Sequence, residues 1–207
     1  MKVINIEKFN REWSERTPLE IIQWAVEQSK NPIVTTNFRP YEAAILHAVT
    51  SLVPRIPVIW CDTGYNTVFT YRHAEKTIEQ LHLNVHLYVP QQSTAHRNVT
   101  LGIPNVNDEK HFEFTQQVKL EPFKRAMKEH KPDVWFTNLR RGQTPFRDGI
   151  GIISYNSDDV LKVSPFYHYS NQQLDSYLTA HQLPNEFRYF DPTKALSNRE
   201  CGLHTQS

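Results

Sequence analysis

The sequence has few cysteines and no long apolar segment. Two cysteines, Cys61 and Cys201, are too few for a zinc or iron–sulfur site with four cysteine ligands from one chain. No apolar run reaches the roughly 18 residues that a membrane span needs, and residues 1–7 lack the pattern of a secretory signal. The ten histidines form no His-Glu-x-x-His motif or similar metal-binding pattern. We therefore expect a cytoplasmic protein without a bound metal or iron–sulfur cluster.

The sequence also lacks an excess of positive or negative charge. The 207 residues contain 23 lysines and arginines against 22 aspartates and glutamates, so the formal net charge is +1. Without a strong basic field we expect no nucleic-acid or membrane partner, and an anionic ligand must be held by a local cluster. Hydrophobic residues make up 39% of the chain, enough for one sizeable core. We expect a single α/β domain over residues 1–184, with a helical segment at 1–29, and a tail over 185–207.

Hydrophobic periodicity predicts a doubly wound α/β fold. Thr17 and Glu20 form a capping box at the start of a helix that ends before Pro32. The run from Val58 to Cys61 is apolar on both faces, as a central parallel strand is. Further helices are predicted from 41 and over 67–81, 121–130 and 170–181, and further strands over 33–36, 84–89, 133–137, 150–155 and 160–164. This order gives a mainly parallel sheet with helices on both faces.

Two segments have weaker patterns. Residues 90–111 are polar with little periodicity, so we expect a loop or a short helix there. Beyond Pro184 the apolar period is lost, which predicts a mobile C-terminal tail.

Polar side chains follow the first predicted strand. Ligands in open α/β sheets bind at the carboxyl ends of the strands. Thr36, Phe38 and Arg39 lie in the connection to the next helix, where hydroxyls and backbone N–H groups can receive a phosphate. The connection has no Gly-x-Gly-x-x-Gly motif, so an ordinary capped connection explains these residues equally well. We take the three residues as candidates for substrate binding.

The strand that ends at Cys61 continues into a polar turn. Gly64 allows a close approach of the backbone to a ligand, which makes Asp62, Thr63 and Gly64 candidate binding residues. Asp62 fits a helix cap or a turn equally well. Cys61 itself is more typical of a small buried core residue than of a reactive one.

An arginine-rich loop follows the predicted strand at 133–137. Its candidate binding residues are Arg140, Arg141, Gln143, Thr144 and Arg147. Clustered guanidinium groups offer forked donors that match phosphate and sulfate oxygens. A solvated basic loop is the alternative, but the position after a buried strand favours an anion site.

The second thiol lies near the C-terminus. Arg199 and His204 flank Cys201 in a polar segment and favour its thiolate form. Cys201 is therefore a candidate nucleophile, although a leftover thiol without a role explains the residues equally well. A disulfide between Cys61 and Cys201 is the minor alternative in a reducing compartment.

Together these motifs resemble the phosphoadenylyl-sulfate reductase family, within the larger group of ATP-pyrophosphatase-like nucleotide-binding domains. The resemblance extends over most of residues 30–168 and the tail. Its strongest parts are Asp62-Thr63-Gly64-Tyr65, the loop from Arg140 to Arg147, Glu121-Pro122-Phe123, and Glu200-Cys201-Gly202-Leu203-His204. In that family the cysteine of the last motif is catalytic, so the resemblance assigns this role to Cys201.

The resemblance implies reduction of 3′-phosphoadenylyl sulfate. The nucleotide would lie across the strand ends, with its phosphates held by the Phe38–Arg39 loop and the arginine loop, and the tail with His204 would close over it. The Cys201 thiolate would attack the sulfur and expel adenosine 3′,5′-bisphosphate, after which thioredoxin or glutaredoxin would release sulfite. Relatives that use adenylyl sulfate typically bind an iron–sulfur cluster through extra cysteines that this chain lacks. Relatives are commonly dimers, so a homodimer stays open.

The sequence departs from the family pattern in two places. Arg39 and Pro40 follow Phe38 where the family usually has a glycine, and a Gly-Tyr-x-Ser segment before the tail is missing. Two alternative functions remain. A nucleotidyltransferase or ATP pyrophosphatase is disfavoured by the absence of Ser-Gly-Gly-x-Asp-Ser, and a catalytically impaired regulatory protein is disfavoured by the retained Cys201 motif.

Overall fold

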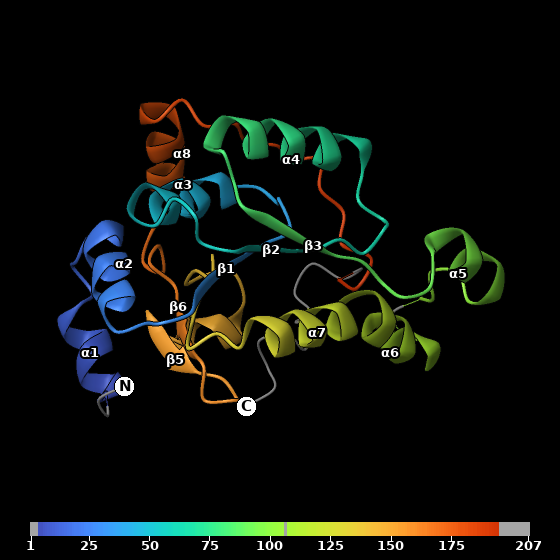
Figure 1. Cartoon of the computed structure of the whole chain (residues 1–207), viewed down its shortest axis with the longest axis horizontal. Coiled ribbons are helices and arrows are strands. Elements are labelled where there is room, and N and C mark those ends of the chain that lie inside the picture. Colours follow the sequence, from blue (N-terminus) through green and yellow to red (C-terminus); the bar gives the residue numbers. More distant parts are fainter. Residues whose placement is uncertain (1–3, 106, 195–207) are drawn as a thin grey trace.

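A six-stranded sheet with helices on both faces forms the core of the computed structural model, which describes residues 4–105 and 107–194 (Figure 1). The strands run in the order β3-β2-β1-β4-β6-β5. They are β1 (Pro32–Thr36), β2 (Val58–Cys61), β3 (Val85–Tyr88), β4 (Val134–Phe136), β5 (Ile153–Tyr155) and β6 (Leu161–Val163). Neighbouring strands are parallel except β5 and β6, which pair antiparallel. The predicted doubly wound, mainly parallel sheet is confirmed.

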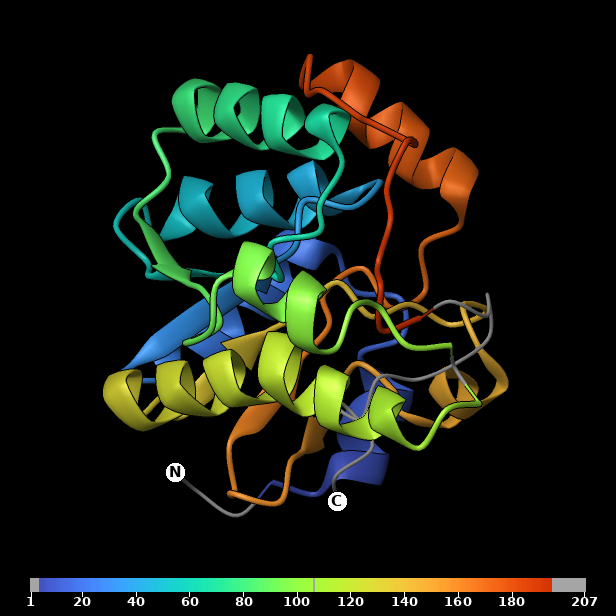
Figure 2. The same ribbon diagram turned by 90° about the vertical axis from the view of Figure 1, so that its right-hand side faces the viewer.

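The helices form two layers of unequal size (Figures 1 and 2). The α-helices are α1 (Ile6–Glu12), α2 (Pro18–Glu27), α3 (Glu42–Leu52), α4 (Val68–Leu81), α5 (Thr94–Thr100), α6 (Lys110–Thr115), α7 (Glu121–His130) and α8 (Asn171–Ala180). A π-helix, Gln116–Leu120, joins α6 to α7, and a 3₁₀ helix spans Pro145–Gly149. Helices α2, α3, α4 and α8 cover one face with the larger hydrophobic core, while α7 covers part of the other face with a smaller cluster around Trp135. No helix in the described ranges is long and apolar enough to cross a membrane.

Capping residues start the helices where the sequence predicts. In α2 the Thr17 hydroxyl accepts the Glu20 N–H at 3.3 Å, and the Glu20 carboxylate accepts the Thr17 N–H at 2.8 Å. Ser170 and Gln173 make the same reciprocal pair at the start of α8, at 3.2 and 2.9 Å. Each pair satisfies two N–H groups that have no partner within the helix.

The segment without clear periodicity contains α5 and the start of α6. Arg97 of α5 is fully buried, and its guanidinium donates to the Gln92 carbonyl at 2.7 Å and to Gln117 Oε1 at 3.2 Å. Helix α5 is therefore held through a buried charged residue that bonds to polar groups. Hydrophobic periodicity carries no signal for such an anchor, so the pattern of residues 90–111 does not distinguish a loop from a short helix.

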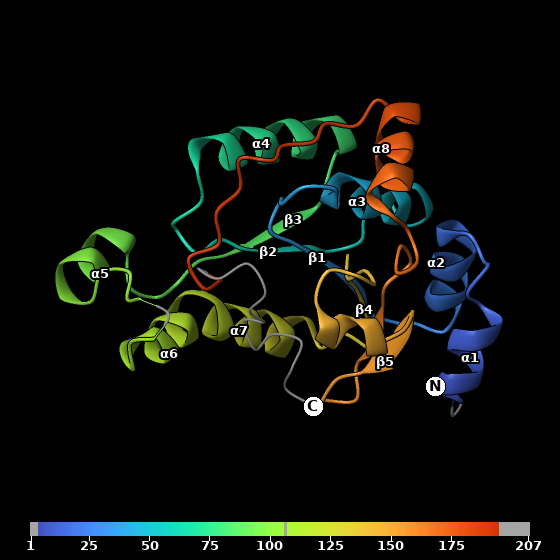
Figure 3. The same ribbon diagram turned by 180° about the vertical axis from the view of Figure 1, so that it is seen from behind.

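The chain beyond α8 returns to the edge of the sheet. Residues 185–194, which begin the expected tail, run along α4 and then down across the carboxyl ends of the strands (Figure 3). Asn185 Oδ1 accepts the Tyr41 N–H at 2.8 Å, and the Thr67 hydroxyl donates to the Arg188 carbonyl at 2.7 Å. This part of the tail is thus tied to the domain. Residues 195–207, including Cys201 and His204, lie outside the described residues.

Candidate active site

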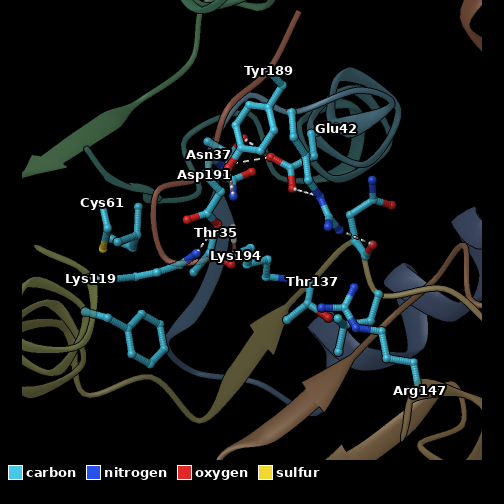
Figure 4. A pocket seen from close by; sticks show the side chains of 16 residues that line it. Thr35, Asn37, Glu42, Cys61, Lys119, Thr137, Arg147, Tyr189, Asp191 and Lys194 are labelled. Carbon is cyan, nitrogen blue, oxygen red and sulfur yellow. Dashed lines mark hydrogen bonds and ion pairs between the residues drawn. The ribbon is translucent and has the colours of Figure 1, made fainter. Parts of the chain in front are cut away.

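A polar pocket lies at the carboxyl ends of β1, β2 and β4 (Figure 4). Its charged lining residues are Arg39, Glu42, Lys119, Arg147, Asp191 and Lys194. Threonine hydroxyls from β1 and the end of β4, together with Ile59, Phe123 and Leu139, complete most of the wall. Basic side chains outnumber acidic ones, so the pocket suits an anionic ligand even though the whole chain is nearly neutral.

The connection from β1 to α3 adopts a left-handed backbone without glycine. Phe38 has φ +53° and Tyr41 has φ +70°, conformations that cost about 1–3 kcal/mol each for residues with a side chain. The Phe38 ring is buried and packs edge-on against Trp60 with ring centroids 4.8 Å apart, which stabilises the bend. Phe38 therefore faces the core, and its ring is not part of the pocket wall.

Glu42, the first residue of α3, binds the donors of this connection. Its carboxylate accepts the Thr36 hydroxyl at 2.7 Å, the Asn37 N–H at 2.8 Å and Arg39 Nε at 3.0 Å. The Asn37 side chain lies between Glu42 and the Tyr189 hydroxyl. The hydroxyl and N–H that the sequence offers to a phosphate thus already hold an internal carboxylate. No role for Glu42 was expected, and the only signal was an acidic residue in the first turn of a helix.

Arg39 reaches across the pocket edge from β1 to β4. In addition to its ion pair with Glu42, its Nη2 donates to the Asn138 carbonyl at 3.1 Å. The guanidinium is partly buried and lines the pocket. Thr36 and Arg39 are therefore the two predicted residues of this connection that the structure brings to the pocket.

The turn after β2 is organised by Asp62. Its carboxylate accepts the Gly64 N–H at 2.9 Å, the Asn66 amide at 2.8 Å and the Tyr71 hydroxyl at 3.0 Å. Burial and the neighbouring Asp62 raise the pKa of Tyr71 to about 12. Asp62 and Gly64 do not line the main pocket, whereas Thr63 borders a small adjoining hollow. The sequence left two roles open for Asp62, ligand binding and a structural role in a turn. The geometry favours the structural role.

Gly64 is required at its position by both backbone and neighbours. Its φ is +80°, and an added Cβ would lie 2.1 Å from Thr94 Oγ1. The Thr94 hydroxyl donates to the Gly64 carbonyl at 3.3 Å, so this turn also holds the start of α5. The close approach at Gly64 is to α5 of the same chain.

The arginine loop brings one of its three guanidinium groups to the pocket. Arg147 is buried and lines the pocket, and its Nη1 donates to Gln143 Oε1 at 2.6 Å. The Thr144 carbonyl accepts the Arg147 N–H at 2.9 Å, which holds the 3₁₀ turn that carries Arg147. Gln143 also accepts the Arg140 N–H at 3.1 Å.

The other two arginines point elsewhere. Arg140 is buried beside α8, where its Nη1 donates to Asn171 Oδ1 at 2.8 Å and its guanidinium lies 5.2 Å from the centre of the Tyr41 ring. Burial and the nearby charge of Arg39 lower the pKa of Arg140. The Arg141 side chain is exposed. Neither residue lines the main pocket.

Lys119 and Asp191 form a buried ion pair at the pocket wall that was not expected from the sequence. Lys119 comes from the π-helix before α7, and Asp191 from the segment beyond α8. Burial by itself would raise the pKa of Asp191, but the charge of Lys119 and hydrogen bonds from Lys119 and Thr193 lower it. π-Helical turns often occur at functional sites. Lys119 lies two residues before Glu121, where a segment of the family resemblance begins, and this proximity is the one signal for Lys119 in the sequence.

Cys61 also faces this pocket. It ends β2 and lines the wall near Lys119. Burial raises the pKa of the Cys61 thiol to about 12, despite the nearby positive charges of Lys119 and Arg125. The thiol is therefore protonated at neutral pH and a weak nucleophile. Among residues 4–105 and 107–194, no three side chains of the types that bind metals gather into a metal site.

Comparisons with known proteins agree with this geometry. The family described as phosphoadenosine phosphosulfate reductase domain matches residues 31–190. A phosphoadenosine 5′-phosphosulfate reductase from Synechocystis sp. is 35% identical over 187 residues, which cover 87% of this chain and 74% of that protein. A protein of the same name from Xylella fastidiosa (strain 9a5c) is 35% identical over 168 residues, which cover 78% and 68%.

Solved structures share the fold. A phosphoadenylyl-sulfate reductase from Candida auris, in a phosphate complex, aligns with a TM-score of 0.77 at 24% identity and covers 89% of this chain and 90% of that chain. An FMN adenylyltransferase from Candida glabrata aligns with a TM-score of 0.55 at 10% identity over 83% of this chain and 62% of that chain. The family match contains every strand of the sheet and the residues that line the pocket as far as Tyr189. The chain therefore belongs to the phosphoadenosine phosphosulfate reductase family.

Proposed function

We propose that this protein reduces 3′-phosphoadenylyl sulfate to sulfite and adenosine 3′,5′-bisphosphate. The observation that carries the proposal is the basic pocket at the strand ends, which Arg39, Lys119 and Arg147 line from three separate segments. The substrate has phosphate and sulfate groups that are anionic at neutral pH. Guanidinium and ammonium groups in a partly enclosed site bind such groups through charge-assisted hydrogen bonds.

The reaction uses Cys201 as the nucleophile. Its thiolate attacks the sulfur of the sulfate group, an Sγ–S bond forms, and the bond between that sulfur and the phosphate oxygen breaks. The electron pair of the broken bond leaves with adenosine 3′,5′-bisphosphate, and a sulfo group remains on Cys201. A thiolate of the electron donor then attacks Cys201 Sγ and releases sulfite, and a second donor thiol resolves the mixed disulfide. The donor dithiol is oxidised and the sulfur is reduced by two electrons.

The pocket residues assist this step electrostatically. Negative charge develops on the leaving phosphate oxygen, and Arg147 and Lys119, which both line the pocket, offset it. Arg39 binds the nucleotide from the β1 side, and Thr36 lines the pocket there while its hydroxyl holds Glu42. Gln143 and Thr144 support Arg147, whereas Arg140 and Asp62 act by holding the loops that surround the pocket.

The remaining assignments come from the family resemblance. Thioredoxin or glutaredoxin is the proposed donor, because a dithiol protein supplies both thiols that the second half-reaction needs. A cytoplasmic location provides the reducing conditions that keep Cys201 as a thiol. His204 and Arg141 remain candidates for contact with the nucleotide, and a homodimer remains open.

One assay tests the proposal against its alternatives. Sulfite release is measured from 3′-phosphoadenylyl sulfate with thioredoxin, thioredoxin reductase and NADPH, and ATP cleavage to AMP and pyrophosphate is measured in parallel. We expect sulfite and no pyrophosphate. Pyrophosphate without sulfite would identify an ATP pyrophosphatase, and nucleotide binding with neither product would identify a regulatory protein.

A further inference from the structure

The Lys119–Asp191 pair links the pocket to the segment beyond α8. Lys119 Nζ donates to the Asp191 carboxylate and lies 3.3 Å from the Thr193 hydroxyl. Asp191 Oδ1 also accepts the Thr193 N–H at 3.0 Å and the Thr193 hydroxyl at 2.6 Å. The side chains of Lys119 and Asp191 are only 10% and 7% exposed, and both line the main pocket.

The burial of this pair limits how it can open. Removing one partner from a buried ion pair leaves an uncompensated charge, which is strongly destabilising. Lys119 can therefore leave Asp191 at low cost only when another anion takes its place. The pocket that both residues line is also the site proposed for an anionic nucleotide, so the replacement anion is available there.

Asp191 belongs to the segment that follows α8 and crosses the pocket edge. We define the strap as residues 185–194. Tyr189 contacts the Asn37 side chain at 2.8 Å, and the Arg188 guanidinium stacks over Phe69 with 3.6 Å to the ring centre. These contacts are partly or fully exposed hydrogen bonds and ring contacts, whereas the contact with Lys119 is a buried charge pair. Loss of that pair removes a buried restraint on the strap at the pocket.

We propose that Asp191 is a positioning residue that holds Lys119 as an internal substitute for an anionic group of the nucleotide. Nucleotide binding displaces the Asp191 carboxylate from Lys119 and loosens the strap. This inference rests on the proposed function, because it requires the nucleotide to bind in this pocket.

Competition between the two anions has a measurable consequence. An internal carboxylate that must be displaced weakens ligand binding. By the same factor, the bound ligand weakens the contact between Asp191 of the strap and Lys119. Coupling of this kind typically changes affinity by about 5- to 150-fold. Asp191→Asn keeps the size of the side chain and an oxygen for Thr193 but removes the competing charge. If Asp191 only supported Lys119, the same change would weaken binding.

The first arm of the experiment measures binding of adenosine 3′,5′-bisphosphate by calorimetry. We expect Asp191→Asn to bind about tenfold more tightly than wild type, while the control Asp158→Asn, in the exposed β5–β6 turn, binds as wild type. In a Lys119→Gln background, Asp191→Asn should bring no gain, because the shared cation is gone. Unchanged or weaker binding by Asp191→Asn would overturn the inference.

The second arm needs no variant and holds even if Asp191→Asn folds poorly. Hydrogen exchange of wild type is followed by mass spectrometry with and without the bisphosphate. We expect faster exchange in peptides that cover the strap and slower exchange around Arg147 when the nucleotide binds. A strap that exchanges equally or more slowly with nucleotide would contradict the displacement. If wild type did not bind the bisphosphate at all, the proposed function would fail together with the inference, whereas binding without the strap response would overturn the inference alone.

Discussion

Two connections lie next to each other at the carboxyl edge of the sheet, and an acidic residue organises each. After β1, Glu42 gathers Thr36, Asn37 and Arg39 at the wall of the main pocket. After β2, Asp62 binds its own turn and the Tyr71 hydroxyl away from that pocket. The first connection contributes charge to the pocket, and the second maintains the shape of its surroundings.

Position after a strand does not by itself make a residue a ligand. Both connections follow neighbouring parallel strands and both contain polar residues that suit an anion. They differ in what their carboxylates bind. Substitutions in the first connection should therefore change nucleotide affinity, and substitutions in the second should change stability.

The largest expected effect concerns the two thiols. Cys61 ends β2 with a protonated thiol, so Cys61→Ser should retain most of the activity, with some loss of packing. Cys201→Ser should lower the rate of sulfite formation by at least about 10³-fold, as is usual on loss of a nucleophile. Intact-mass and peptide mass spectrometry after incubation with substrate and no reductant should find the sulfo group on Cys201. An adduct on Cys61 would show that the β2 connection is catalytic.

The next effect is on stability. Gly64→Ala forces an unfavourable φ and a clash with Thr94 Oγ1, so we expect a loss of about 2–3 kcal/mol in the free energy of unfolding. Gly142→Ala is the matched control, because its φ is +77° with nothing within 4 Å of the added Cβ. It should cost about 1 kcal/mol. Urea unfolding measures the free energy of unfolding of both variants. Equal losses would show that the close contact with Thr94 of α5 does not contribute to the effect of Gly64→Ala.

A smaller effect separates the two connections directly. Arg39→Ala should weaken binding of adenosine 3′,5′-bisphosphate about tenfold, or about 1.4 kcal/mol. Asp62→Asn should lower the melting temperature and leave the dissociation constant nearly unchanged. Calorimetry and thermal unfolding of the two variants check this split. The comparison would be broken if Asp62→Asn lost as much affinity as Arg39→Ala.

The smallest effect is a pH dependence at the second connection. The pKa of Tyr71 is raised from 10.0 to about 12, so the unfolded chain releases this proton at lower pH than the folded protein. The resulting stabilisation is complete below about pH 10 and is lost as the pH rises toward 12. Tyr71→Phe should therefore reduce the fall in melting temperature between pH 9 and pH 11. An identical fall in melting temperature in both proteins would show that the pKa of Tyr71 is the same in the folded and the unfolded protein.

Local sequence was sufficient for much of the fold. The capping pair Thr17–Glu20 acts within one helical turn, and its hydrogen bonds form as predicted. The β4 strand is buried on both faces, as its continuous apolar run indicates. The order of strands and helices follows from the same patterns, because each depends on residues a few positions apart.

The site was predictable only in outline. The sequence indicated the strand ends and the arginine loop, and the structure brings Thr36, Arg39 and Arg147 of those candidates to the main pocket. The sequence could not indicate that Arg140 turns toward α8 or that Phe38 enters the core, because both orientations depend on neighbours distant in the chain. Glu42 was missed because its donors meet only after the β1 connection bends.

Periodicity, caps and motifs are local properties of the chain, so they were enough to predict the α/β class, the start of α2 and the family. Which charges share the pocket depends on contacts between distant segments, so it follows only from the folded structure. Lys119 and Asp191 are 72 residues apart and meet where the chain returns from α8 to the strand ends. Their attraction becomes strong because both side chains are removed from water, and burial of this kind exists only in the folded chain.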